Sequence, residues 1–396
     1  MACQSATLCY NGWMDHQYTR SLSLGKHLNK SSLFLFGARN TGKSFLIQHT
    51  FPKLRYIDLL DSDCYSALLR RPKALEEMLT IKDKCVIIDE IQKLPALLDV
   101  IHRLIETRKI NFLLTGSSSR KIKREGGNLL GGRAREFHLY PLTSKELGLD
   151  FDLIKYLNRG GLPRIYKSDD PYIDLKAYVN LYLAEEIKQE ALIRKFEQFV
   201  RFLDTMSLSN GEELHLANIA NDSGISPRTL EGYIQVLEDT LVGFQVYPFF
   251  KTKKRKAITK SKFYFFDIGV TNFLANRGEI KNKSELFGRA LEQFIALEIR
   301  AYLSYNNKRE QLYYWRTKNG FEVDFIIGTK AAIEVKASSR ISDSELKNLK
   351  ALREEKLIEK YFVISQEPFR RTVDGITILP IGEFLKELWS DRLFTV

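Results

Sequence analysis

The sequence predicts an α/β protein with more than one domain. Its 396 residues exceed what a single hydrophobic core usually supports. Three continuous apolar runs, typical of strands buried on both faces of a parallel sheet, lie at 33–36, 85–88 and 112–114. In the last third of the chain a helix, three strands, a helix and a strand follow one another. We therefore expect a parallel-sheet core, a mostly helical middle part and a C-terminal αβββαβ domain.

The composition is that of an ordinary globular protein, with 44% hydrophobic and 28% charged residues. No apolar run reaches the roughly 18 residues of a membrane helix, and the N-terminus has no apolar segment after a basic one. The four cysteines, at positions 3, 9, 64 and 85, have no C-x-x-C spacing, which argues against structural zinc and suits reduced thiols. We therefore expect a cytoplasmic protein without a membrane segment.

The central motif lies at residues 37–44, where an apolar strand runs into a loop that fits the pattern G-x-x-x-x-G-K-[ST]. The backbone N–H groups of such a loop, with the N-terminus of the next helix, form a site for phosphates. Lys43 would reach the β- and γ-phosphates, and Ser44 would bind Mg²⁺. The sequence therefore predicts ATP and Mg²⁺ as cofactors. The expected nucleotide-binding residues are Gly37, Ala38, Arg39, Asn40, Thr41, Gly42, Lys43, Ser44 and, from the next motif, Asp89.

A second motif follows the buried strand at 85–88, where two acids stand in sequence. Because the carboxyl ends of parallel strands meet at one edge of a sheet, these acids would emerge beside the phosphates. Asp89 would hold Mg²⁺ through water, and Glu90 would orient and activate the attacking water. Glu90 and Lys43 are therefore the predicted catalytic residues of a nucleotide hydrolase.

Two further groups are candidates for contact with the reacting phosphate. Ser117 and Ser118 follow the strand at 112–116, and a hydroxyl there could sense the γ-phosphate, although serines after a strand are also common turn formers. Arg133 and Arg135 come just before the last expected strand of the core. Either could stabilise transferred charge as an arginine finger, or be an ordinary surface arginine.

Several segments together carry a resemblance to a known family: GARNTGKS, VIIDEIQKLP, LLTGSSSRKIKR, NLLGGRAREFHLYPLT and GGLP at 160–163. They resemble the AAA-type ATPase domain of a large group of prokaryotic P-loop proteins, in which a C-terminal domain of unknown function follows. The resemblance covers nearly the whole chain. It implies a sheet-and-helix ATPase core at 1–145 that uses a glutamate at a strand edge for hydrolysis.

The middle of the chain divides into two expected segments. Residues 146–210 have apolar positions at helical spacing, which predicts a helical connector. Residues 211–280 give a helix, a turn and a second helix with Ser226 as its cap and Pro227 at its first position, followed by two apolar strands. A helix-turn-helix followed by a hairpin is a winged helix. Its reading helix would begin with Arg228, Thr229, Glu231 and Tyr233.

Positive charge is concentrated in this second segment. The chain has a net charge of +12, and residues 241–280 hold eight Lys or Arg against two acids. Lysines and an arginine at 253–256 would lie at the tip of the wing and contact nucleic-acid phosphates, although a basic balance also serves solubility. Glu231 and Glu238 on the second helix argue against reading of bases. The alternative is a winged helix that is only a structural joint or a protein contact.

The C-terminal segment, 281–396, resembles the core of PD-(D/E)XK nucleases, a restriction-endonuclease-like fold. Asp324 lies on the second expected strand, and Glu334 and Lys336 lie on one face of the third. The two carboxylates could share one Mg²⁺, and Lys336 could position or deprotonate a water. Glu292 on the preceding helix could add a carboxylate or be an ordinary surface glutamate. The predicted catalytic residues here are Asp324, Glu334 and Lys336, with Asp324 and Glu334 as metal ligands.

These segments together predict a protein that binds and hydrolyses ATP and couples its nucleotide state to nucleic-acid binding and Mg²⁺-dependent phosphodiester cleavage. The expected partner is nucleic acid, most simply DNA. The alternative is an ATP-dependent molecular switch whose nuclease-like domain is inactive and recruits DNA or a protein, with self-association possible in either case.

Overall fold

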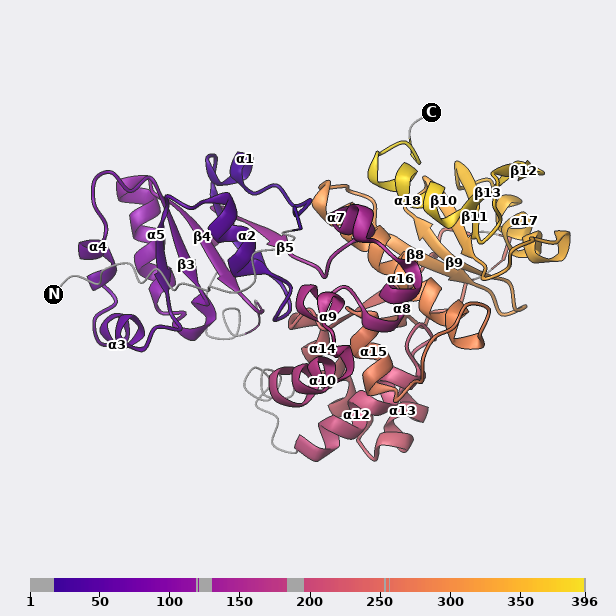
Figure 1. Ribbon diagram of the computed structural model, residues 1–396, viewed down its shortest axis with the longest axis horizontal. Coiled ribbons are helices and arrows are strands. Elements are labelled where there is room, and N and C mark those ends of the chain that lie inside the picture. Colours follow the sequence, from indigo (N-terminus) through magenta and orange to yellow (C-terminus); the bar gives the residue numbers. More distant parts are fainter. Residues whose placement is uncertain are drawn as a thin grey trace. The chain divides into compact units, whose positions relative to one another are not determined.

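The computed structural model describes residues 18–394 apart from 119, 121–129, 184–195, 253 and 256, and it leaves out the side chains of 181–183. The chain divides into two compact units, Met1–Leu139 and Tyr140–Val396, called unit 1 and unit 2 below (Figure 1). No helix in the described ranges is long and apolar enough to cross a membrane.

Unit 1 is built on a five-stranded sheet in the order β2-β3-β4-β1-β5, and every neighbouring pair is parallel. Its central strands are buried, as their continuous apolar sequences predict. The strands are β1 (Ser32–Phe36), β2 (Arg55–Asp58), β3 (Cys85–Asp89), β4 (Asn111–Gly116) and β5 (Ala134–His138). Because β1, β4 and β3 are neighbours and run parallel, the loops after all three strands open at the same edge of the sheet.

The helices of unit 1 include α2, which begins at Lys43 directly after the glycine-rich loop, as predicted. Residues 62–78 form two helices and not one, because Pro72 forces the residue before it out of the helical conformation. Arg71 accordingly has φ −144° and ψ 83°. The helical elements are α1 (Gly25–Leu28), α2 (Lys43–Thr50), α3 (Ser62–Arg70), α4 (Ala74–Met78), η1 (Ile91–Lys93), α5 (Leu97–Arg108) and η2 (Leu130–Gly132).

Unit 2 begins with the helices that the periodicity of residues 146–210 predicts. They are α7 (Ser144–Leu147), η3 (Gly148–Asp150), α8 (Leu153–Arg159), α9 (Pro163–Lys167), α10 (Pro171–Ala177), η4 (Tyr178–Leu183) and α12 (Phe196–Leu208). The expected helix-turn-helix follows as α13 (Leu216–Ser223) and α14 (Pro227–Asp239). The side chain of Ser226 caps α14 by accepting from the N–H of Thr229, with Pro227 at the first position of the helix.

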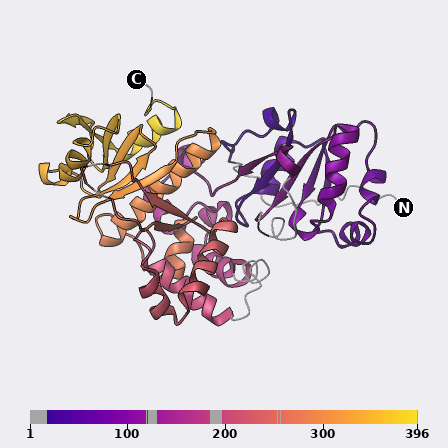
Figure 2. The same cartoon turned by 180° about the vertical axis from the view of Figure 1, so that it is seen from behind.

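An eight-stranded mixed sheet forms the rest of unit 2, in the order β12-β13-β11-β10-β9-β8-β6-β7 (Figures 1 and 2). The hairpin of β6 (Gly243–Pro248) and β7 (Lys262–Phe265) joins this sheet through a parallel pairing of β6 with β8. The remaining strands are β8 (Leu312–Arg316), β9 (Glu322–Ile327), β10 (Ala331–Val335), β11 (Lys360–Ser365), β12 (Arg371–Val373) and β13 (Ile376–Pro380). The boundary predicted near residue 280 therefore falls inside one compact unit, and the finer division of unit 2 stays a prediction.

The C-terminal elements follow the predicted order αβββαβ and then continue. The long helix α16 (Glu285–Tyr305) precedes β8, β9 and β10, and η5 (Asp343–Leu346) with α17 (Lys347–Arg353) precedes β11. β12, β13 and α18 (Ile381–Trp389) extend this core, and α15 (Ile268–Leu274) links β7 to α16. Trp315, Val323, Ile326 and Leu349 are among the buried residues that pack between the sheet and α17.

Candidate functional site

The glycine-rich loop of unit 1 has the conformation that its sequence predicts. Gly42 caps α2 with φ 92°, a region that residues with a Cβ rarely adopt, and Asn40 has φ 64°. Gly37 is required for a different reason, because a Cβ there would come within 2.5 Å of the carbonyl oxygen of Leu139. The loop therefore turns tightly between β1 and α2 and leaves the N-terminus of an eight-residue helix at its end.

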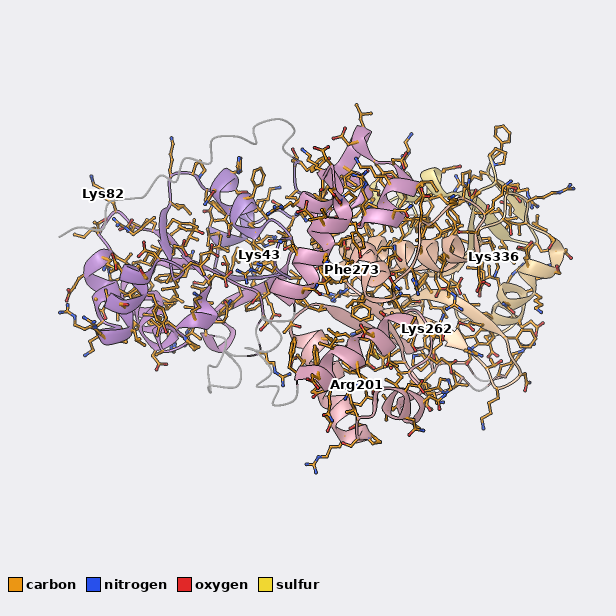
Figure 3. The ribbon with its side chains drawn as sticks, turned by 60° about the horizontal axis from the view of Figure 1, so that its bottom comes forward. Lys43, Lys82, Arg201, Lys262, Phe273 and Lys336 are labelled. Atoms are coloured by element: carbon orange, nitrogen blue, oxygen red, sulfur yellow. The ribbon has the colours of Figure 1, made fainter. Side chains whose placement is uncertain are left out.

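Lys43 lies over this loop with only 7% of its surface exposed (Figure 3). Its Nζ donates to the carbonyl oxygens of Gly37 at 2.7 Å and Ala38 at 3.3 Å. The loop is further fixed by Arg20, whose guanidinium donates to the carbonyl oxygen of Thr41 at 2.6 Å. The ammonium group therefore stands at the mouth of the phosphate-binding loop, where hydrogen bonds to two backbone carbonyls hold it.

Asp89 is the centre of the polar contacts at this edge of the sheet, and it is 2% exposed. Its Oδ2 accepts from Ser44 Oγ at 3.1 Å and from the hydroxyl of Tyr56, and its Oδ1 accepts from the hydroxyl of Thr115. Burial and then the negative charge of Asp89 raise the pKa of Tyr56, so this hydroxyl keeps its proton. The residues predicted to hold Mg²⁺, Ser44 and Asp89, are thus in direct contact.

Glu90 follows in a left-handed conformation with φ 59° and ψ 43°. Its N–H donates to Thr115 Oγ1 at 3.3 Å, and its Oε2 accepts from the amide of Gln92 at 2.5 Å. Non-glycine residues in this region are uncommon and are maintained only when their surroundings fix them. Here Thr115 on β4 supplies that support, because its hydroxyl accepts from the Glu90 N–H and donates to Asp89 Oδ1.

Of the residues predicted to contact the reacting phosphate, Ser117 lies at the site and the two arginines do not. Ser117 Oγ accepts from Gln92 Nε2 at 3.3 Å, so this serine belongs to the cluster at the end of β4. Arg135 lies within β5 rather than before it, opposite Leu33 at the start of β1. Arg133 is partly exposed and pairs with Glu106. Because β5 and β1 run parallel, both arginines lie toward the opposite edge of the sheet from the loop that follows Phe36, and neither serves this unit's own loop.

A second group of charged residues lies on the sheet of unit 2, where Asp324, Glu334 and Lys336 come together. Lys336 Nζ lies 2.7 Å from Glu334 Oε1, and Asp324 Oδ2 accepts from the N–H of Val335 at 2.7 Å. Glu334 is 2% exposed, and its Oε2 is buried without a hydrogen-bond partner in the described part of the chain. The pleat of the two neighbouring strands thus brings the two carboxyl groups and the lysine together, as predicted.

The electrostatics of this group suit a cation. Burial and the charge of Glu334 raise the pKa of Asp324 well above its usual range, and burial also raises that of Glu334. Burial lowers the pKa of Lys336, but the carboxylates of Glu334 and Asp324 outweigh it, and the net shift is upward. Lys336 is therefore an ammonium group at neutral pH, which fits positioning a water and not deprotonating it.

Glu292 does not join the two carboxylates as a free ligand. Its Oε1 accepts from Lys262 Nζ at 3.1 Å and from the hydroxyl of Tyr264 at 2.6 Å. Lys262, which is buried (Figure 3), also pairs with Glu322 at 2.7 Å. Among the residues with described positions, no group of three or more His, Cys, Asp or Glu could hold a metal ion. Any metal here would have two carboxylate residues as its protein ligands.

The basic segment at 251–256 differs from the free wing that we expected. Arg255 donates to the carbonyl oxygen of Ala351 at 3.0 Å and pairs with Glu354 at 2.7 Å, and its guanidinium lies 5.3 Å from the ring centre of Phe321. The N–H groups of Lys254 and Arg255 both donate to Glu355. This arginine is therefore held against the end of α17. Lys253 and Lys256 lie outside the described residues.

The predicted reading helix, α14, is also only partly exposed to solvent. Arg228 and Glu231 are exposed, as a reading helix requires. Tyr233, however, packs against α12, with ring centres 5.0 Å from Phe199 and 5.4 Å from Phe202. Its ring therefore contributes to the packing between α12 and α14, and the role of α14 as a reading helix stays a prediction. Sequence reasoning also missed Tyr56, Thr115 and Lys262, each of which contacts a predicted site residue from a distant part of the chain. It missed Gln92 as well, which contacts Glu90 from two residues away.

Three family models match the chain in succession: an AAA domain at residues 29–148, a domain of unknown function (DUF8612) at 150–281, and another (DUF4143) at 287–384. Curated relatives include two uncharacterized proteins. MJ1544 of Methanocaldococcus jannaschii is 29% identical over 327 residues, which are 74% of this chain and 71% of that protein. Rv2008c of Mycobacterium tuberculosis is 26% identical over 270 residues, which are 65% of this chain and 60% of that protein.

Solved structures align only weakly with the whole chain. The ORC1 protein of Aeropyrum pernix, solved in complex with DNA, aligns with 15% identity and a TM-score of 0.25, over 62% of this chain and 86% of its own. Domain III of the replication initiation protein DnaA from Thermotoga maritima aligns with 14% identity and a TM-score of 0.24, over 55% and 88%. Scores this low carry no argument. The family match at residues 29–148, together with the loop and the parallel sheet, supports an AAA-type P-loop ATPase domain that binds and hydrolyses nucleotide.

Proposed function

We propose that unit 1 binds ATP with Mg²⁺ at residues 37–44 and hydrolyses it with Glu90 as the residue that orients the attacking water. The observation that carries this is the contact of Ser44 Oγ with Asp89 Oδ2 at 3.1 Å. A hydroxyl and a buried carboxylate beside a phosphate-binding loop are the oxygen donors that Mg²⁺ takes in such sites. The ion would neutralise phosphate charge when bound.

The protein's own residues would divide the remaining work. Backbone N–H groups of the loop and the N-terminus of α2 would bind phosphate oxygens, and Lys43 would exchange its hydrogen bonds to loop carbonyls for bonds to phosphate. Glu90, fixed by Thr115 and Gln92, would hold and orient a water for in-line attack.

The test is ATP binding and hydrolysis by the full chain with Mg²⁺. Lys43→Ala should abolish binding, since it removes the ammonium group at the mouth of the loop. Glu90→Gln should bind ATP and hydrolyse it about 100-fold or more slowly, the usual cost of losing a positioned base. Lys82→Ala is the matched control, because Lys82 is an exposed lysine of the same unit (Figure 3). Hydrolysis by Glu90→Gln at the wild-type rate would contradict the assignment.

A second candidate function rests on unit 2. We propose that Asp324 and Glu334 hold one divalent cation and that Lys336 positions a water for phosphodiester hydrolysis, with nucleic acid, most simply DNA, as substrate. The supporting observation is the buried, unpartnered Oε2 of Glu334 beside a carboxyl group whose charge is disfavoured, since a cation would satisfy both. Coupling to the ATPase would require that nucleotide states differ in their contacts with unit 2.

Cleavage of plasmid DNA and of single-stranded DNA and RNA, with Mg²⁺ or Mn²⁺ and with or without ATP, tests this second proposal. Asp324→Ala and Glu334→Ala should abolish cleavage while leaving ATP binding intact, and Glu359→Ala, on an exposed residue, should change neither. Should the wild type cleave none of these substrates, the alternative takes its place: an ATP-dependent switch whose nuclease-like domain recruits DNA or a protein without cutting it.

A further inference from the structure

Gln92 links the two strand ends that meet at the proposed hydrolysis site. It lies in the short helix η1 directly after Glu90, and it is 6% exposed. Its Nε2 donates to Glu90 Oε2 at 2.5 Å and to Ser117 Oγ at 3.3 Å. One buried amide therefore ties the carboxylate that follows β3 to the hydroxyl that follows β4.

The glycine at position 116, the last residue of β4, leaves room for this amide. A Cβ at Gly116 would come within 2.3 Å of Gln92 Oε1 and 3.2 Å of its Cδ. Gly116 does not have a positive φ, so backbone conformation does not explain a glycine at this position. The close approach of the Gln92 side chain does explain it.

The carbonyl oxygen of the Gln92 amide, Oε1, is buried and has no hydrogen-bond partner within the described ranges. Burying an unpaired carbonyl oxygen opposes folding, so fold stability alone favours an apolar residue of similar size here. A group retained against that cost calls for a specific explanation, and its two donated hydrogen bonds supply one.

Glu90 needs such support, because its backbone has the left-handed conformation with φ 59°. Thr115 Oγ1 accepts from the Glu90 N–H, which fixes the backbone. Gln92 donates to the carboxylate and so restrains its side-chain torsions. Thr115 at the end of β4 therefore holds the backbone of Glu90. Gln92, which also contacts Ser117 after β4, holds its carboxylate.

We propose that Gln92 is a positioning residue for nucleotide hydrolysis, which holds the Glu90 carboxylate in a fixed orientation and in register with Ser117. The inference rests on the proposed ATPase function and deepens it. A fixed orientation of the group that aligns water accelerates attack. Since Gln92 acts on Glu90 and not on nucleotide, it affects the rate and not ATP affinity.

The test compares the ATP dissociation constant and kcat of the full-length wild type, Gln92→Ala and Gly116→Ala. The first variant removes the amide, and the second displaces it while leaving residue 92 intact. Both should bind ATP within about twofold of the wild type, with kcat lower by ~10- to 100-fold, the loss expected for a misplaced reacting group. Gln48→Ala, on an exposed glutamine of the same unit, is the control.

The outcomes separate this inference from the function on which it rests. Absence of ATP hydrolysis by the wild type would refute the proposed function and this inference with it. Hydrolysis by the wild type, with an unchanged kcat in Gln92→Ala, would refute the inference only. If both variants lose ATP binding or fail to fold, Gln92 is a structural residue and the positioning role is wrong.

Discussion

Glu298 on α16 makes the stability of unit 2 depend on pH in a way that can be measured. Its carboxylate is 1% exposed and accepts from Ser144 N–H at 2.7 Å, Ser144 Oγ at 2.8 Å and Trp389 Nε1 at 2.6 Å. Burial raises the pKa of Glu298 from 4.5 to about 7, against the opposing effect of these three hydrogen bonds. Folding therefore favours the protonated form of this side chain.

The sign and size of the effect follow from linkage between proton binding and folding. Since the folded state holds the proton more tightly, the stabilisation is complete below pH 4.5 and is lost as the pH rises through about 7. Each unit of pKa difference is worth ~1.4 kcal/mol. The raised pKa of Glu298 therefore removes about 3 kcal/mol of unfolding free energy between pH 4.5 and 7.

We expect Glu298→Gln to remove this dependence. Urea unfolding of wild type and variant, followed by tryptophan fluorescence from pH 4.5 to 8, should give a difference in unfolding free energy that changes by about 3 kcal/mol across the window in favour of the variant at high pH. Glu285→Gln on the same helix is the control, because Glu285 is 88% exposed. If the difference between Glu298→Gln and wild type is the same at pH 5 and pH 8, Glu298 is ionised throughout and the reasoning is wrong.

Three further predictions test other parts of the structure. Gly37→Ala should abolish ATP binding, since its Cβ would lie 2.5 Å from the carbonyl oxygen of Leu139; wild-type affinity in a binding titration would contradict this. Tyr56→Phe should lower the melting temperature of unit 1, because the hydrogen bond to Asp89 is worth about 1.5–3 kcal/mol, and an unchanged melting curve would show that the hydroxyl contributes nothing. Arg255→Ala should leave the salt dependence of DNA binding unchanged, whereas a shallower log–log slope, by ~1, would identify it as a phosphate contact.

The fold of unit 1 and the contacts within its site were largely predictable from the sequence. The glycine-rich loop and the acids after β3 follow local rules: conformations that favour glycine, and strand ends that meet at one edge. The partners of Asp89 were not predictable in this way. Tyr56 comes from β2 and Thr115 from β4, and only the strand order, with β4 beside β3, brings them to the same carboxylate.

In unit 2 the period-2 pattern predicted where Asp324, Glu334 and Lys336 lie but not what surrounds them. Lys262 reads in the sequence as one more member of a basic stretch, yet it is buried between two glutamates. The difference arises because β7 is a strand of the large sheet and not part of an exposed wing. Whether a residue is buried depends on pairing between strands that are distant in the sequence. Such pairing cannot be read from local charge and hydropathy.

The pairing of β6 with β8 has a consequence for how this architecture can be divided and inherited. A fragment beginning at residue 281 would leave β8 as an open edge of the sheet, with unpaired N–H and C=O groups, and would strip Lys262 from Glu292 and Glu322. Open edges invite pairing with other chains and aggregation. We therefore expect that the segment matched by the C-terminal family cannot be moved between proteins on its own, and that recombination preserves it only together with the hairpin at 243–265.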